Sequence, residues 1–563
     1  MIARARRHGL AVAVALVAVG GCAGVPDSGP VRVGRPVAAA GGGLADVTVR
    51  EVPAGPQPGA SPVQLVGGFL RAMVDSDGGY GVARSYLAPG TTWSTASGMT
   101  IYAEPSRLVP SGRDTVVVRA QRVGVVGPHG VYRVGGGSIR RTYHLTRHAG
   151  QWRISHLDAG VLLSSDDAGR LLQPAALYFL TPAGTRLVPQ PVLVPPQEPG
   201  IATTLIRGLL AGPSPLLAPG VRTAVPRGTT LVGNVPISAD GVAEVDLSSG
   251  ASQISAAQGA RLSAQIVWTL SQLSSVTAVH LLANGSPLEA PGVPSLQPAS
   301  SWRQFDPAPV AALRGALVVH DGNVLGIDAA VPPALNHVAL IAAARSADGQ
   351  VLAGIRDTGA SEELLVGDIA GPLHQRLRAT QITSPTFGPG NAVFVATSSG
   401  HVYAAAPDSR PQRVTLTGRL KGASVRDLAM SRDGARVAAV VATAGGAELD
   451  LATVVQSGSR FEFREPRVLV RARSDVAGVA WAAADELVTT VLRAGGRRGV
   501  VRVTSDGYQI ADLSGPGLPA AVDTVAAAPG ERVLAASPAG TWQLAGRRWR
   551  RVSEAASPEY AGG

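Results

Sequence analysis

Apolar residues recur at the three- to four-residue spacing of amphipathic helices in several stretches of the first 300 residues. Ser61 followed by Pro62 is typical of a helix start, and Gly212-Pro213 of a helix end. Runs of alternating or β-branched residues between and after these stretches indicate strands. The expected helices cover 62–74, 80–87, 199–210 and 256–273. The expected strands cover 115–118, 130–134, 139–145, 151–157, 176–180, 186–189, 230–232, 242–247 and 279–283.

This order of elements predicts two small α+β domains. In the first, over 61–165, two helices precede a long antiparallel meander. That order resembles the NTF2-like fold, a likeness of fold alone that implies no ligand. The second domain covers 175–295 and its last strand turns at Asn284-Gly285. Residues 46–52 also alternate, and we expect them to add an edge strand to the first domain.

Between residues 310 and 552 the pattern changes to short strands separated by tight turns, which recur at intervals of about 41 to 51 residues. A period near 45 residues with several strands per repeat is the signature of propeller blades. Five units are clear, and we expect a sixth from 317–319 together with 541–544. The chain is therefore expected to be multidomain, two α+β domains followed by an all-β propeller, with a tail at 553–563.

The first 22 residues have the three parts of a lipoprotein signal sequence. A basic stretch opens the chain, ten apolar residues follow at 10–19, and two glycines precede Cys22. Ten apolar residues suit a signal peptide and are too few to span a bilayer. This order looks like a bacterial lipobox. We therefore expect residues 1–21 to be a signal peptide, and Cys22 to carry S-diacylglycerol and N-palmitoyl groups.

Cys22 is the only cysteine, so disulfides and thiolate metal sites are excluded. Lipid on Cys22 would hold the protein on the extracytoplasmic face of the cell membrane, because two or more acyl chains give durable attachment. Residues 22–60 are rich in glycine and proline, which indicates a flexible, mostly extended tether.

The chain has a formal net charge of +11, carried almost entirely by arginine, with Lys421 as the only lysine. An exported protein with scattered arginines is not expected to bind nucleic acid. Attraction to anionic lipid headgroups or to an anionic cell-wall polymer is the more useful interpretation. A GC-rich genome, which favours arginine, explains the same composition without any function.

Four motifs in the second domain look like those of the GerMN domain, in the family's order and over about 90 residues. The resemblance implies a binding or assembly module of exported bacterial proteins rather than an enzyme. The motifs are Leu209-Leu210-Ala211-Gly212-Pro213-Ser214, Val225-Pro226-Arg227-Gly228-Thr229, Val245-Asp246-Leu247-Ser248 and Gln265-Ile266-Val267-Trp268-Thr269-Leu270.

The whole arrangement resembles the actinobacterial lipoprotein LpqB family. A lipobox, an NTF2-like region, a GerMN domain and a propeller occur in that order, and residues 23–31 are similar to the family's opening after its cysteine. The resemblance implies contact with the extracellular domain of the sensor kinase MtrB and an effect on signalling to MtrA. Cell-envelope upkeep and division would lie downstream. Residue spacing by itself does not indicate this partner.

Sequence motifs of catalysis are not found: there is no nucleophile elbow, phosphate loop or zinc-binding helix. His144 and His148 are four residues apart but flank a predicted turn, so a metal site there is not favoured. The carboxylate pairs Asp166-Asp167 and Glu362-Glu363 are interpreted as solvated surface. We therefore expect no enzyme activity, no catalytic residues, no cofactor and no metal site.

Tryptophans in strand or helix patterns, at 152, 268 and 481, are expected to fill cores. Trp542 and Trp549 lie beside four arginines, and such a group can stack on sugars or hold anionic groups. The same residues can equally close the last blade, which is the favoured interpretation.

Three functional hypotheses remain open at this point. The first is a lipid-anchored, non-catalytic regulator of the MtrA/MtrB system. The second is a binder of cell-wall glycan or lipid-linked envelope precursors. The third, least favoured, is a hydrolase in the propeller funnel, since the acidic or histidine cluster that it needs cannot be assembled from the sequence.

Overall fold

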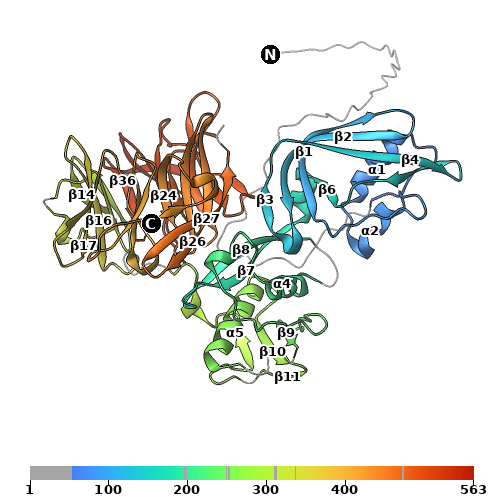
Figure 1. The fold of residues 1–563 in the computed structure, drawn as a ribbon, viewed down its shortest axis with the longest axis horizontal. Helices are drawn as coiled ribbons and strands as arrows, with labels where there is room; N and C mark the ends of the chain where they lie inside the picture. The colour runs from blue at the N-terminus through green and yellow to red at the C-terminus, as the bar shows by residue number, and fades with distance from the viewer. Residues whose placement is uncertain are drawn as a thin grey trace, which may run out of the picture. The chain divides into compact units, whose positions relative to one another are not determined.

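The protein is described here from a computed structural model, which covers residues 53–562 apart from 196–199, 249, 251–253, 289, 310–313, 337 and 472–473. The described part consists of an N-terminal α+β domain, a second α+β domain and a C-terminal β-propeller (Figure 1). The predicted fold class is thus confirmed. The predicted strand at 46–52, the signal sequence and most of the tether lie outside the described residues.

The N-terminal domain is a six-stranded sheet with helices on one face. Its strands run in the order β5-β4-β2-β1-β6, with β3 paired to β2, and all pairs are antiparallel except β1 with β6. The helices are α1 (Pro62–Ala72), α2 (Asp77–Arg84) and α3 (Ser165–Leu171). The strands are β1 (Met99–Pro110), β2 (Thr115–Val126), β3 (Tyr132–Val134), β4 (Ser138–His148), β5 (Gln151–His156) and β6 (Val161–Ser164).

Helix α1 begins as the sequence predicts. Ser61 is the N-cap, and its hydroxyl accepts a hydrogen bond from the Gln64 amide while the Gln64 side chain accepts one from the Ser61 amide. The apolar side of α1 packs against β1, β2 and β5. There Phe69 is fully buried and meets Trp93 and Tyr143 at ring-centroid distances of 5.3 and 5.9 Å. This aromatic core occupies the helix-covered face of the sheet; on the opposite face Val117 is buried, while Arg119 beside it is exposed.

The second domain packs two helices between two small sheets. Strands β7 (Gln173–Leu180) and β8 (Leu187–Val194) form a hairpin. Strands β9 (Val242–Leu247) and β10 (Ala278–Ala283) pair in parallel, and β10 also pairs with β11 (Ser286–Pro287) and β12 (Leu296–Pro298). The helices are α4 (Ile201–Leu210) and α5 (Ala256–Leu270).

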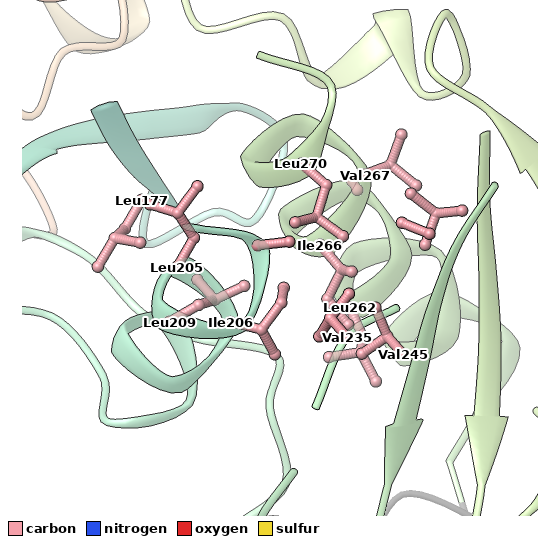
Figure 2. Close-up of a cluster of buried hydrophobic side chains, with 14 of the residues drawn as sticks. Leu177, Leu205, Ile206, Leu209, Val235, Val245, Leu262, Ile266, Val267 and Leu270 are labelled. Carbon is pink, nitrogen blue, oxygen red and sulfur yellow. The ribbon is translucent and has the colours of Figure 1, made fainter. Parts of the chain in front are cut away.

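Both helices of this domain turn the predicted residues inward (Figure 2). Leu262, Ile266 and Leu270 of α5 have no exposed surface, and they share one core cluster with Leu205 and Leu209 of α4. Burial of each such side chain stabilises the domain by about 1.5–3 kcal/mol. The predicted facing of α5 is therefore confirmed, although the helix ends at Leu270 rather than near 273.

The propeller contains six sheets in the described part of the chain. Five of them are built from consecutive strands, namely β15–β18, β19–β22, β23–β27, β28–β31 and β32–β35. The strands are β15 (Ala342–Arg345), β16 (Val351–Asp357), β17 (Glu362–Asp368), β18 (His374–Ala379), β19 (Thr386–Phe387), β20 (Val393–Ala396), β21 (Val402–Ala405), β22 (Gln412–Arg413), β23 (Thr415–Leu416), β24 (Val425–Met430), β25 (Arg436–Thr443), β26 (Gly446–Ser457), β27 (Arg460–Val470), β28 (Val479–Trp481), β29 (Glu486–Leu492), β30 (Arg498–Thr504), β31 (Ile510–Asp512), β32 (Thr524–Ala526), β33 (Leu534–Ser537), β34 (Gly540–Ala545) and β35 (Arg548–Ser553).

The sixth sheet joins the two ends of the propeller sequence and corrects two predictions. Strand β13 (Ala316–His320) pairs with β14 (Asn323–Ile327) and with β36 (Ala556–Tyr560). Residues 541–544, expected to close the ring, lie in β34 of the preceding sheet. The expected tail at 553–563 instead supplies the closing strand, because Leu317 and Ala316 need a hydrogen-bonding neighbour that the chain's last residues provide.

Candidate functional site

The predicted site residue Cys22 lies outside the described residues. Within the described part of the chain, no helix is long and apolar enough to cross a membrane. Among the same residues, no group of three or more histidine, cysteine or acidic side chains is placed to hold a metal ion. His144 contacts Thr115 and His156 rather than His148, so the structure does not bring the two spaced histidines together.

The GerMN-like motif at 265–270 has a specific structural role. Its helix, α5, lies along the free edge of β7, whose other edge is paired with β8. Gln265 Nε2 donates to the Tyr178 carbonyl at 2.8 Å, and the Tyr178 amide donates to Thr269 Oγ1 at 3.3 Å. An unpaired strand edge costs free energy when it is buried and invites association when it is exposed. The polar side of α5 replaces the missing strand.

Gln272 and Arg222 complete this edge. Gln272 accepts from the Ala176 amide at 2.8 Å and donates to the Ala176 carbonyl at 2.7 Å. The backbone of Leu180 exchanges two 2.8 Å hydrogen bonds with Arg222. Gln265 also accepts from the Ala224 amide at 2.6 Å, which fixes the loop after Arg222. Within the motif, Gln265 and Thr269 make hydrogen bonds to the backbone, which explains why polar residues stand among its apolar ones.

A small pocket between several propeller blades is lined by two half-buried carboxyl groups, Asp427 of β24 and Glu559 of β36. Burial raises the pKa of Asp427 to about 7. Burial, followed by the charge of Asp427, raises the pKa of Glu559 to about 8. Both oxygens of Asp427 accept backbone hydrogen bonds at 3.0 Å, one from Leu428 and one from Val479 on β28. Asp427 therefore joins two neighbouring blades.

A basic group lies near Glu559. Arg432 lies close enough for its charge to lower the pKa of Glu559, and burial lowers the pKa of the Arg432 guanidinium itself to about 10. Its two terminal nitrogens have no hydrogen-bond partner among the described residues. Sequence reasoning missed this cluster because Glu559 was assigned to a tail and its neighbours are far away in the sequence.

The adjacent carboxylates Glu362 and Glu363, which we predicted to be solvated, both have partners within the fold. Glu363 is 6% exposed and its carboxylate lies 2.6 Å from Arg356 of the neighbouring strand. Glu362 points the other way and accepts a hydrogen bond from the Ile382 amide. The divergence of the two side chains is as expected for a strand. The error was to treat both as exposed, because partners on adjacent strands cannot be read from sequence spacing.

Asp167 likewise has local partners. It follows the helix N-cap Ser164, whose hydroxyl donates to its carboxylate at 2.7 Å, and Arg170 pairs with it one turn later. These contacts give Asp167 a role in holding the start of α3.

Trp549 closes the last complete blade, as favoured, and Trp542 packs against the rim of the same core. Trp549 is 3% exposed and its indole donates to the Leu513 carbonyl at 3.0 Å. Trp542 is half-buried, and the Arg551 guanidinium lies 5.9 Å from its ring centroid. Trp549 is therefore a core residue, while Trp542 lies at the rim of that core, partly exposed beside the arginines of β35.

Comparison with known proteins identifies the family. A family model described as "Lipoprotein LpqB, N-terminal domain" matches residues 55–169, and one described as "Lipoprotein LpqB beta-propeller domain" matches 315–561. A protein named Lipoprotein LpqB from Thermobifida fusca is 30% identical over 100% of both chains. The chain belongs to the lipoprotein LpqB family. The LpqB relative from Rhodococcus jostii is also 30% identical, over 97% of this chain and 95% of its own.

Further matches cover the second domain and another relative. A model described as "Sporulation and spore germination", the GerMN domain, matches residues 176–289 of this LpqB family member. An LpqB protein from Mycobacterium bovis is 28% identical over 92% of each chain. The first GerMN domain of the sporulation protein GerM from Bacillus subtilis is 30% identical over 22% of this chain and 92% of its own, with a TM-score of 0.19. The chain is thus a lipoprotein family member with GerMN and propeller domains.

Proposed function

We propose that this protein is a lipid-anchored, non-catalytic accessory protein on the extracytoplasmic face of the cell membrane. It binds the extracellular domain of the sensor kinase MtrB and modulates signalling to MtrA, with effects on envelope homeostasis and division. The observation that carries the proposal is membership of the LpqB family across the whole chain. The identity of the partner as this kinase is inferred from the resemblance to that family.

The fold supports a binding role. Its sheets and helices have densely packed cores, so their surfaces keep a fixed shape on which a partner can dock without large rearrangement. The lipid on Cys22 would confine the protein to the same membrane as the kinase. Confinement raises the effective concentration of two partners and makes a weak contact sufficient.

A regulator changes the output of a kinase only if it binds the kinase's signalling states with different affinities. The test therefore measures association and output together. Both ectodomains are tethered to one supported bilayer, and their association is followed by fluorescence energy transfer. Kinase autophosphorylation is measured in vesicles with and without the lipoprotein. Association with altered autophosphorylation supports the proposal. The proposal fails if tethered ectodomains at matched density associate no more than a tethered unrelated protein.

A second candidate is binding of cell-wall glycan or lipid-linked envelope precursors. It is favoured by Trp542, which Arg551 covers, beside the exposed Arg548 and Arg550 of the edge strand β35. Sedimentation with purified wall polymer tests this candidate. If the wild-type protein co-sediments and a W542A variant does not, the result would favour binding of the cell envelope as the function. If both proteins co-sediment to the same extent, Trp542 does not take part in binding the polymer.

A further inference from the structure

Three arginines stand directly beside one another on the exposed face of the N-terminal sheet. Arg107 of β1 pairs in register with Arg119 of β2, and Arg119 pairs in register with Arg140 of β4. Residues directly opposite on adjacent strands project to the same face, with Cβ atoms about 4.5–5.5 Å apart. All three side chains are exposed. We call this set the arginine row.

The arginine row has no local neutralisation. In the described part of the chain, none of the three side chains has a hydrogen bond or a salt bridge. Arg141, the neighbour of Arg140 on the opposite side of β4, does pair with Asp158 at 3.1 Å. Like charges directly opposite each other destabilise a sheet. The row therefore places three positive charges side by side without a hydrogen bond or salt bridge to hold them among the described residues.

The charge of the whole domain has the same sign. Residues 61–165 contain eleven arginines, no lysine and five acidic residues, a formal charge of +6 out of +11 for the chain. The helices and the aromatic core cover the other face of the sheet. The charged face is therefore complementary to an anionic surface.

We propose that the arginine row binds the anionic phospholipid headgroups of the membrane that holds Cys22. The proposal rests on lipidation of Cys22 and is independent of the kinase. A sheet face presents its charges in one broad layer, which suits a membrane surface. Each basic residue at an anionic membrane surface strengthens binding by a factor of about five.

The length of the tether supports this occupant. Thirty residues, 23–52, separate Cys22 from the first described residue, and together they span at most ~100 Å when extended. The tether expected from the composition of this segment would keep the domain within ~30 Å of the anchor on average. That distance is long enough for the exposed face to turn toward the bilayer and short enough to keep it near the headgroups. The lipid and the arginine row would then form a two-point attachment.

Vesicle co-sedimentation tests the proposal with the full chain from residue 22, carrying Cys22→Ser so that only the protein surface can bind. The vesicles contain 30% phosphatidylglycerol in phosphatidylcholine, or phosphatidylcholine alone. The test variant is R107Q/R119Q/R140Q. The control variant, R227Q/R410Q/R497Q, removes the same charge from three exposed arginines of the second domain and propeller.

We expect binding to the anionic vesicles alone, weakened by salt. The test variant should lose about 100-fold in affinity if its three arginines act independently, and the control variant less than threefold. Equal losses in the two variants would overturn the proposal, because net charge rather than the row would then explain binding. Binding of the wild type to purified anionic wall polymer but not to vesicles would also overturn it. Thermal unfolding of both variants verifies that each is folded.

Discussion

The N-terminal domain and the GerMN domain are α+β units of similar size that use their polar side chains in opposite ways. Residues 61–165 carry a formal charge of +6, whereas residues 175–295 carry five arginines and five acidic residues and are neutral. In the GerMN domain Gln265 and Thr269 of α5 form hydrogen bonds with the edge of β7. In the N-terminal domain the arginine row turns outward without a partner in the described chain.

This difference separates residues that build the fold from residues that the fold displays. Gln265 and Thr269 satisfy backbone groups that would otherwise be buried and unpaired, so their removal should lower stability. The arginine row makes no such contact, so its removal should leave stability unchanged or raise it. Four measurements test this difference.

The largest effect is expected from Leu270→Asp in the GerMN domain. Leu270 is fully buried, and an unpaired carboxylate in that core should cost more than about 4 kcal/mol in the free energy of unfolding. The control is Ala257→Asp, at an exposed position in the first turn of the same helix, where a negative charge is favoured. Limited proteolysis and chemical denaturation compare the two. Wild-type protease resistance in Leu270→Asp would show that the helix packs differently.

Gln265→Leu should have the next largest effect. It leaves the Ala224 amide and the Tyr178 carbonyl without their side-chain partner, each of which costs about 1–3 kcal/mol when buried. Gln258→Leu is the matched control, because it removes a single half-buried hydrogen bond of 3.2 Å to the Ala224 carbonyl. Urea denaturation should rank the control as the more stable variant. The reverse order would contradict the role assigned to the polar side of α5.

In the propeller, the carboxyl group of Glu559 is an example of a charge that the fold disfavours. An unfolded glutamate ionises near pH 4.3, and the folded chain keeps the Glu559 proton to about pH 8. Between these values the folded state binds more protons than the unfolded state, so stability falls as pH rises. Glu559→Gln should flatten this dependence and raise stability at pH 9 by about 1–2 kcal/mol. Thermal unfolding from pH 5 to 9 measures how stability depends on pH, and Glu554→Gln, at an exposed position, is the control. A wild-type stability that rises over this range would contradict the assignment.

The smallest effect is expected from Arg119→Gln, the central member of the arginine row. Removing one of three like charges in register should raise the free energy of unfolding by about 0.5 kcal/mol at low salt, and by less at high salt. Arg113→Gln, in the exposed loop between β1 and β2, should change it less. A clear loss of stability in Arg119→Gln would mean that this side chain has a structural partner.

Helical periodicity and turn chemistry predicted much of the fold. The facing of α5 follows from the spacing of Leu262, Ile266 and Leu270, and the start of α1 follows from Ser61 and its proline. The recurrent Asp-Gly turns indicated the propeller, because Gly349 and Gly434 both adopt the positive φ of 73° that such turns require.

Features that depend on strand register could not be predicted. Strand β1 was missed because Glu104, Pro105 and Arg107 interrupt its apolar pattern at a bulge. Without β1 there was no way to see that Arg107 lies beside Arg119. The closing strand β36 was missed for a similar reason, since Ser557-Pro558 looks like the end of a domain. Because β36 was not predicted, the cluster of charged residues around Glu559 was not predicted either.

In-cell crosslinking tests whether the protein contacts the sensor kinase. Cells that express the wild type or Cys22→Ser at equal levels are crosslinked, and the captured proteins are identified by mass spectrometry. The proposed function predicts that the wild type captures a sensor-kinase ectodomain, with crosslinks on a defined surface, and that Cys22→Ser captures much less. Capture of wall-synthesis proteins or glycan alone, in both forms equally, would contradict it.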